Sequence, residues 1–272
     1  MAREQNKNLI LINHAPMLDE AIFNYYTKYY RDTLGLPNWE SLAKSRSTEE
    51  QTEKKRIISF EKKVGSIHGK YLLNIGCGTG GFNVVATERG AIVYGIDPDE
   101  EAFRICHMKA EKYNIPAERF KLSNAEQLPF DDNVFDLVNC FTVLEHVADV
   151  KKTLLEMVRV TKPGGVIYTN SPHYWCLYEG HYKMFWCPLF LIRPIGKLYL
   201  FLRNRPTQFY DTLNFLNNRT IGNALKGQNV SITHFKKALV KIPGFFGTLA
   251  YFYYKVFGID SNIEITIVKG SA

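Results

Sequence analysis

Cysteine is scarce in this chain, and its spacing is unlike that of a disulfide framework or a zinc site. The 272 residues include five cysteines, an odd number, and no two of them have the C-x-x-C spacing of a zinc ligand pair. Free thiols of this kind are typical of a reducing compartment. The sequence therefore predicts neither disulfides nor a metal site.

Long apolar runs are also missing. A membrane-spanning helix needs about 18 apolar residues in succession, and the best candidate, residues 184–202, is interrupted by two prolines, an arginine and a lysine. The N-terminal apolar run Leu9–Ile12 is too short for a signal peptide. We therefore expect a cytoplasmic protein, with at most peripheral contact at the inner face of a membrane.

Positive charge is in excess but is not concentrated. The formal net charge is +7, yet no run of five consecutive Lys or Arg residues occurs. Such an excess favours an acidic partner, such as nucleic acid, an anionic membrane or a phosphorylated substrate, but scattered charges equally suit a solvated surface. Because no RNA-binding motif accompanies the charge, nucleic acid is not an expected partner.

Short β-rich runs and helical patterns alternate between residues 71 and 170. This alternation predicts an α/β fold with a parallel sheet and right-handed crossovers, whose ligands bind at the carboxyl ends of the strands. A final alternating segment, 261–268, predicts an edge strand. The predicted strands are 71–75, 91–96, 120–122, 135–141 and 166–169, separated by helices at 82–89, 100–113 and 150–160.

Aromatic and basic residues crowd together after residue 171 and break this alternation. We therefore expect three parts. Residues 1–66 would form an N-terminal helical extension, and residues 67–171 with 258–272 would form the core. Residues 172–257 would form an insertion that lies over the ligand-binding end of the sheet.

The stretch NIGCGTGGF, residues 74–82, fits two kinds of cofactor loop. Gly76 and Gly78 followed by Gly80 read G-x-G-x-G, as in enzymes that bind S-adenosylmethionine (SAM), whereas Gly81 as the third glycine gives the dinucleotide pattern. In both, the backbone passes close beneath a ligand whose anionic group meets a helix N-terminus. Asp97, after the next strand, could accept ribose hydroxyls of either cofactor or cap a helix. The loop alone leaves both cofactors open.

Residues 123–165 separate the two possibilities. They read SNAEQLPFDDNVFDLVNCFTVLEHVADVKKTLLEMVRVTKPGG and resemble the class I SAM-dependent methyltransferases, in particular the branch with the ubiquinone and menaquinone methyltransferases. The resemblance spans roughly residues 70–170 and the final strand. It implies a Rossmann-like sheet, mostly parallel, with a final antiparallel edge strand. The family motifs occur in order at Asn124–Glu126, Leu128–Phe130, Phe135–Asp136, Leu144–Asp149 and Lys162–Gly165.

The resemblance also implies SAM as the cofactor and a set of residues that bind it. Two of them depart from the family, because Asn74 and Asn124 stand where the family has acids. An amide keeps an acceptor oxygen but loses the charge, so weaker SAM binding is expected. The implied set is Asn74, Gly76, Cys77, Gly78, Gly80, Asp97, Pro98, Asn124, Ala125, Glu126 and Phe141.

Methyl transfer from an activated sulfonium requires the protein to position the acceptor and to remove a proton. His146 follows the fourth strand, and His181 lies in the polar and aromatic stretch 173–186. Since imidazole ordinarily titrates near neutrality, both are expected as candidate bases. Each also has a structural interpretation: His146 would organise a helix start, and His181 would belong to a packed cover.

The expected function is methyl transfer from SAM to a small-molecule, glycan or lipid-linked acceptor, with oxygen as the favoured atom. The alternatives are an NAD(P)-dependent oxidoreductase that uses the same loop and a non-catalytic scaffold. Residues 183–205 and 235–257 mix basic and aromatic side chains. This mixture suits an anionic membrane surface or a lipid-linked acceptor, and equally a packed core or a dimer interface. The sequence leaves the oligomeric state open.

Overall fold

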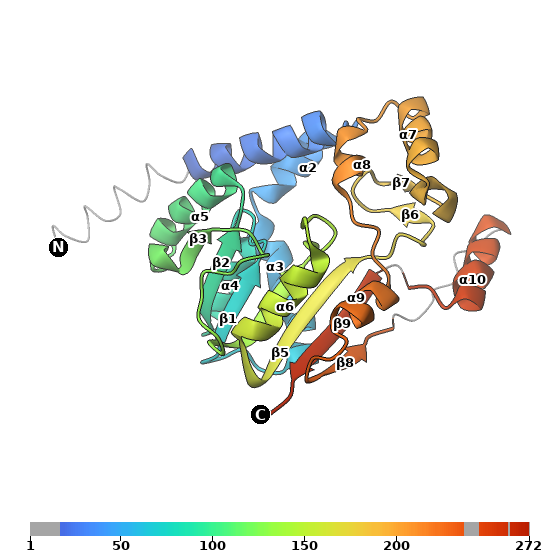
Figure 1. Cartoon of the computed structure of the whole chain (residues 1–272). Helices are drawn as coiled ribbons and strands as arrows, with labels where there is room; N and C mark the ends of the chain where they lie inside the picture. The colour runs from blue at the N-terminus through green and yellow to red at the C-terminus, as the bar shows by residue number, and fades with distance from the viewer. Residues whose placement is uncertain (1–16, 237–244, 261, 272) are drawn as a thin grey trace.

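The computed structural model describes residues 17–236, 245–260 and 262–271, and within them helices cover both faces of a seven-stranded sheet (Figure 1). The strand order is β3-β2-β1-β4-β5-β9-β8. The strands from β3 to β5 are parallel, which confirms the predicted α/β alternation. Their bounds are β1 (Tyr71–Ile75), β2 (Ile92–Asp97), β3 (Phe120–Leu122), β4 (Phe135–Phe141) and β5 (Thr161–Pro172).

The predicted final strand pairs antiparallel with β5, as expected, but another strand covers its outer side. This strand is β9 (Asn262–Lys269), and β8 (Val230–His234) forms the edge beside it. No strand was predicted here: the sequence VSITH alternates, but only Val230 and Ile232 carry the apolar pattern, and neither is fully buried. β8 and the preceding α9 (Asn218–Ala224) pack with the core although they fall within the predicted insertion 172–257, and the division into three parts stays a prediction.

Helices on the two faces bury two separate apolar layers. On one face, α3 (Glu49–Val64) and α4 (Gly81–Glu88) pack against the sheet, and α5 (Glu100–Lys112) packs beside α4. On the other face, α6 (Val150–Val160) and α9 cover the larger layer. Burial of these apolar faces is the main stabilising contribution to such a sandwich.

The N-terminal helices and the insertion share an aromatic core above the sheet. Residues 17–27 are helical and continue into the π-helix η1 (Lys28–Thr33). Leu34 and Leu36, which follow it, pack with Trp186 and Tyr210 of the insertion. The remaining elements are α2 (Trp39–Arg46), η2 (Ala117–Arg119), β6 (Tyr178–Glu179), β7 (Met184–Phe185), η3 (Pro188–Leu191), α7 (Arg193–Leu202), α8 (Gln208–Thr212) and α10 (Phe245–Phe257).

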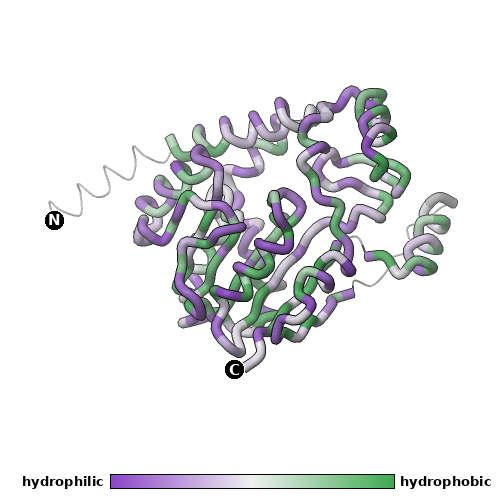
Figure 2. Tube along the Cα trace, viewed as in Figure 1, coloured by the Kyte–Doolittle hydropathy of each residue, from purple (hydrophilic) through white to green (hydrophobic). Residues whose placement is uncertain are grey.

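Hydrophobic residues recur along α7 and α10 at the side of the molecule (Figure 2). Phe201 and Leu202 of α7 are 73% and 69% exposed, and Val256 of α10 is 74% exposed. Among the described residues, no helix is both long and apolar enough to cross a membrane. The apolar run Leu9–Ile12 and part of the segment 235–257 lie outside the described residues.

Candidate functional site

The carboxyl ends of β1 to β4 enclose a cavity of about 650 Å³, a size that suits a nucleoside-containing ligand. Gly76 lines it after β1, Pro98 after β2 and residues 123–127 after β3. The turn after β4 closes the cavity with Val143 and His146. The predicted residues that meet here are Gly76, Pro98, Asn124, Ala125, Glu126 and His146.

The glycine loop needs backbone conformations that favour glycine. Gly76, Gly78 and Gly80 have φ angles of 65°, 52° and 84°, all in the left-handed region. A Cβ on Gly76 would also overlap the side chain of Val143. The loop therefore takes this path beneath the cavity only because these positions carry no side chain.

Asp97 fastens this loop to the end of β2. Its Oδ2 accepts a hydrogen bond from the backbone N–H of Gly78 at 2.8 Å, and its Oδ1 accepts one from the N–H of Asp99 at 3.0 Å. Burial raises the pKa of Asp97, and these two bonds oppose that rise. Asp97, which is predicted to bind the ribose, thus holds the loop, although its side chain does not line the cavity.

A buried ionic network braces the loop from the N-terminal helices. The Thr79 hydroxyl donates to Glu49 Oε1 at 2.6 Å and lies 3.1 Å from the Tyr26 hydroxyl. Glu49 forms an ion pair with Lys109 of α5, and both side chains are almost completely buried. Arg46 approaches Glu49 Oε2 to 3.1 Å. Sequence reasoning missed this network because its members come from four distant segments.

Asn74 does not line the cavity, and its predicted contact with the cofactor stays a prediction. It is buried on the opposite face of β1, where its Nδ2 donates to Asn83 Oδ1 at 2.6 Å and its Oδ1 accepts from Asn139 Nδ2 at 2.7 Å. An amide can donate and accept in this way, whereas a carboxylate can only accept. The departure from the family pattern is thus explained by a neighbouring amide network.

Asn74→Asp is expected to destabilise the fold by about 1–3 kcal/mol, because it buries a carboxylate and removes the donor to Asn83. Burial would raise the pKa of the new carboxyl above its unfolded value, so the cost should be present at pH 7 and shrink as the pH falls towards 4. Urea unfolding at several pH values measures this. Asn124→Asp, at an exposed position, is the matched control. Unchanged stability with tighter SAM binding would contradict the assignment.

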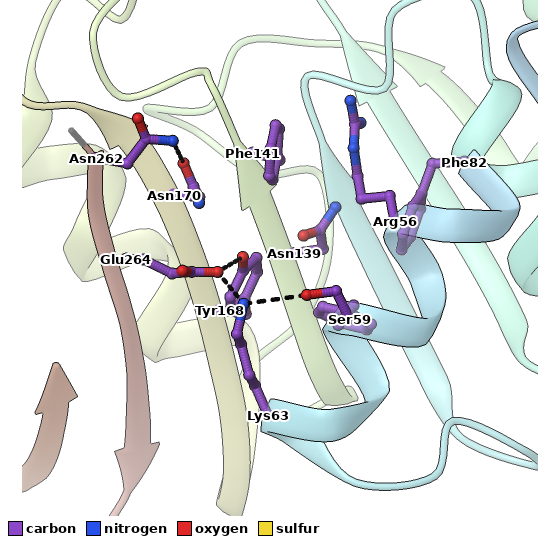
Figure 3. Close-up of a pocket in the computed structure, with 11 residues that line it drawn as sticks. Arg56, Ser59, Lys63, Phe82, Asn139, Phe141, Tyr168, Asn170, Asn262 and Glu264 are labelled. Atoms are coloured by element: carbon purple, nitrogen blue, oxygen red, sulfur yellow. Dashed lines mark hydrogen bonds and ion pairs between the residues drawn. The ribbon is translucent and has the colours of Figure 1, made fainter. Parts of the chain in front are cut away.

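Phe141 and Cys77 also lie outside the cavity lining. Phe141 faces α3, where the Arg56 guanidinium lies 4.1 Å from its ring centroid. It lines a second cavity of about 200 Å³, in which Lys63 pairs with Glu264 (Figure 3). The Cys77 thiol lies 3.8 Å from that of Cys106, and all five cysteines are free.

His146 and His181, the two predicted bases, are neighbours in space. Their ring centroids are 5.1 Å apart, and Phe209 contacts both rings. The turn that carries His146 begins at Thr142, whose φ of 55° is unusual for a residue other than glycine. Asn214 holds this turn, since its side chain donates to the Val147 carbonyl at 2.6 Å.

Two glutamates that sequence reasoning missed complete this group. Glu179 Oε1 lies 2.6 Å from Nδ1 of His181, and its Oε2 accepts from the N–H of Tyr182. Burial lowers the pKa of His181, but Glu179 outweighs burial and raises it overall. Burial and His181 lower the pKa of His146 to about 3, and burial raises that of Glu145 to about 7. The only sequence signal was the proximity of Glu179 to His181 in the chain.

The aromatic residues around His181 mainly build the core of the insertion. Tyr174 and Tyr182 are 2% and 0% exposed and pack with Trp186, whereas Tyr178 is exposed. Tyr174 and Tyr182 therefore belong to a packed cover. The hydroxyl groups of these two tyrosines are thus not available to contact a ligand.

Comparison with known proteins gives a family for the core. Residues 73–169 match the family described as a methyltransferase domain. This part of the core thus matches a methyltransferase domain. The ubiquinone biosynthesis O-methyltransferase of Coxiella burnetii is 30% identical over 116 residues, which cover 43% of this chain and 49% of that protein. The chain thus spans about half the length of the curated relatives it matches.

Solved structures share the fold of this methyltransferase domain. The geranyl diphosphate C-methyltransferase of Streptomyces coelicolor A3(2) is similar over 94% of this chain and 98% of its own, with a TM-score of 0.54 and 16% identity. An S-adenosylmethionine-dependent methyltransferase of Mesorhizobium loti is similar over 78% and 96%, with a TM-score of 0.53 and 17% identity. These likenesses confirm the predicted class I methyltransferase fold.

Proposed function

We propose that this protein transfers a methyl group from SAM to an acceptor held beside His146 and His181. The cavity carries this proposal, because the glycine loop at Gly76, the loop 123–127 after β3 and His146 all line it. A ligand in it would extend from the loop after β3 to the turn after β4. The matched methyltransferase domain covers all of these elements.

The reaction requires the C–S bond of SAM to break, with its electron pair returning to sulfur, while the acceptor forms a bond to the methyl carbon. A hydroxyl acceptor also loses its proton. His146 lines the cavity, and His181 lies beside His146, with 5.1 Å between their ring centroids. Their role in receiving this proton stays a prediction.

Oxygen is the acceptor atom we propose, because the curated relatives that match this chain are described as O-methyltransferases. A small-molecule or lipid-linked acceptor fits a site covered by the insertion. Contact with a membrane surface stays a prediction. The exposed apolar residues of α7, flanked by Arg203 and Arg205, would supply it. Sedimentation with anionic vesicles would test this contact.

Calorimetric titration with SAM tests the proposed function. Asp97→Ala is expected to weaken binding by about tenfold to a hundredfold, because it removes charge-assisted hydrogen bonds to the loop and to the ribose. Asp131→Ala, at an exposed position, is the control. NADH binding without SAM binding would favour the oxidoreductase, and binding of neither would favour a scaffold.

A further inference from the structure

A cluster of potential metal ligands lies where the turn after β4 meets the insertion. Glu145, His146 and His181 each offer one ligand atom, and these atoms all lie within 4.8 Å of one another. The turn supplies two of them, and the segment between β6 and β7 supplies the third. Small side-chain rotations would bring the three atoms to the bonding distances of one cation, which are about 2.0–2.2 Å for zinc.

Glu145 lacks the partners that a buried carboxylate needs. It is 0% exposed, and neither of its oxygens makes a hydrogen bond of normal geometry with any described residue; only the Ser171 hydroxyl and its own backbone N–H come near enough to favour the ionised form. His146 Nε2 lies 3.9 Å from its Oε1. A buried carboxylate with so few partners is costly unless it is protonated or a cation compensates for it. A cation at this point would compensate for the charge of Glu145.

His181 is oriented as metal-ligating histidines are. Glu179 contacts its Nδ1 and is itself held by the N–H of Tyr182, which leaves Nε2 as the ligand atom. A carboxylate that holds one nitrogen of an imidazole fixes the orientation of the ring for a metal on the other nitrogen. Two imidazoles and a carboxylate favour zinc or a similar transition-metal ion over magnesium, which prefers oxygen ligands.

We propose that Glu145, His146 and His181 bind a divalent transition-metal cation, with Glu179 positioning His181. His146 also lines the large cavity, so the open coordination positions would face a ligand there. If the proposed methyl transfer to oxygen holds, the cation would bind the acceptor hydroxyl and ease loss of its proton to water. The two histidines would then act as ligands rather than as bases.

The test is calorimetric titration of the full chain, freed of metal with a chelator, with zinc chloride and separately with magnesium chloride. We expect one zinc ion per chain and much weaker magnesium binding. Glu145→Gln and His181→Asn should each weaken zinc binding by at least about 100-fold, and Glu179→Gln by about 10- to 100-fold, as for residues that orient a metal ligand.

His173→Asn, at another buried histidine outside the cluster, is the matched control and should bind zinc normally. Cobalt(II) absorption gives a second measurement, because its spectrum reports nitrogen ligation directly. Circular dichroism and SAM titration of each variant show whether it is folded, and they report on the proposed function independently of the metal. Absence of stoichiometric zinc binding, or equal affinity in folded Glu145→Gln and His181→Asn, would overturn the proposal.

Discussion

Lys109→Met is expected to lower the free energy of unfolding by about 3–5 kcal/mol, the usual cost of removing one partner of a buried ion pair. Lys109 is 0% exposed and pairs with Glu49, and it also lies 2.7 Å from Glu50. Methionine fills a similar volume, so the loss would come from the uncompensated carboxylate of Glu49 rather than from a cavity. Urea unfolding monitored by circular dichroism measures the change.

The cost of Lys109→Met should depend on pH. In the wild-type protein, burial tends to raise the pKa of Glu49, but Lys109 and Arg46 outweigh burial and hold it below its ordinary value of 4.5. Without Lys109 burial dominates, and the folded pKa should rise above the unfolded one. The extra cost is then full above the raised pKa of Glu49 and shrinks as the pH falls towards and below 4.5, because Glu49 is protonated.

Lys55→Met on the exposed side of α3 is the control for Lys109→Met and should change stability by less than about 0.5 kcal/mol. Because Glu49 also accepts from Thr79 in the glycine loop, the Lys109 variant should bind SAM more weakly as well. A Lys109 variant as stable as Lys55→Met at pH 7 would show that the network does not stabilise the fold.

Gly76→Ala is expected to abolish measurable SAM binding and to destabilise the fold by about 2–5 kcal/mol. A Cβ at this position would overlap Val143 across the cavity, and overpacking costs about 1–3 kcal/mol. The φ of 65° adds about 1–2 kcal/mol for a residue with a side chain. SAM titration and urea unfolding measure the two effects.

A second substitution separates the two causes. Val143→Ala removes the overlapping methyl groups, so Gly76→Ala combined with Val143→Ala should regain the part of the stability that the overlap cost. Gly78 has a φ of 52°, but a Cβ added there would meet nothing within 4 Å. Gly78→Ala should therefore lose only the stability that the unfavourable φ costs. Equal losses in Gly76→Ala and Gly78→Ala would refute the overlap with Val143.

The parallel core was predictable because its signals are local. The apolar runs of β1, β2 and β4 and the glycines at 76, 78 and 80 are visible in short windows of sequence. β8 was not predicted, because only Val230 and Ile232 of its five residues are apolar and its pairing with β9 joins residues 31 to 39 positions apart. An edge strand with few buried side chains has only a weak local pattern.

In the candidate site, too, the sequence predicted some residues well and others poorly. Residues that directly follow predicted strands, such as Gly76, Pro98 and Asn124, line the cavity, since parallel strands end at the same edge. Asn74 and Phe141, assigned to the same ligand, have other neighbours, namely Asn83 and a second cavity, because successive side chains of a strand alternate between faces; their contact with the ligand stays a prediction. The family pattern gave their positions in the chain but not the environment of their side chains.

By itself, the sequence determined the class of fold, the cofactor loop and the methyltransferase motifs, because each depends on residues close together in the chain. The tertiary structure alone decided which charged groups meet. It joined Lys109 to Glu49 beneath the loop and brought His181 to Glu145 and His146. Burial and electrostatic coupling arise from distances in space, and residues 36 or 60 positions apart carry no local signal of them.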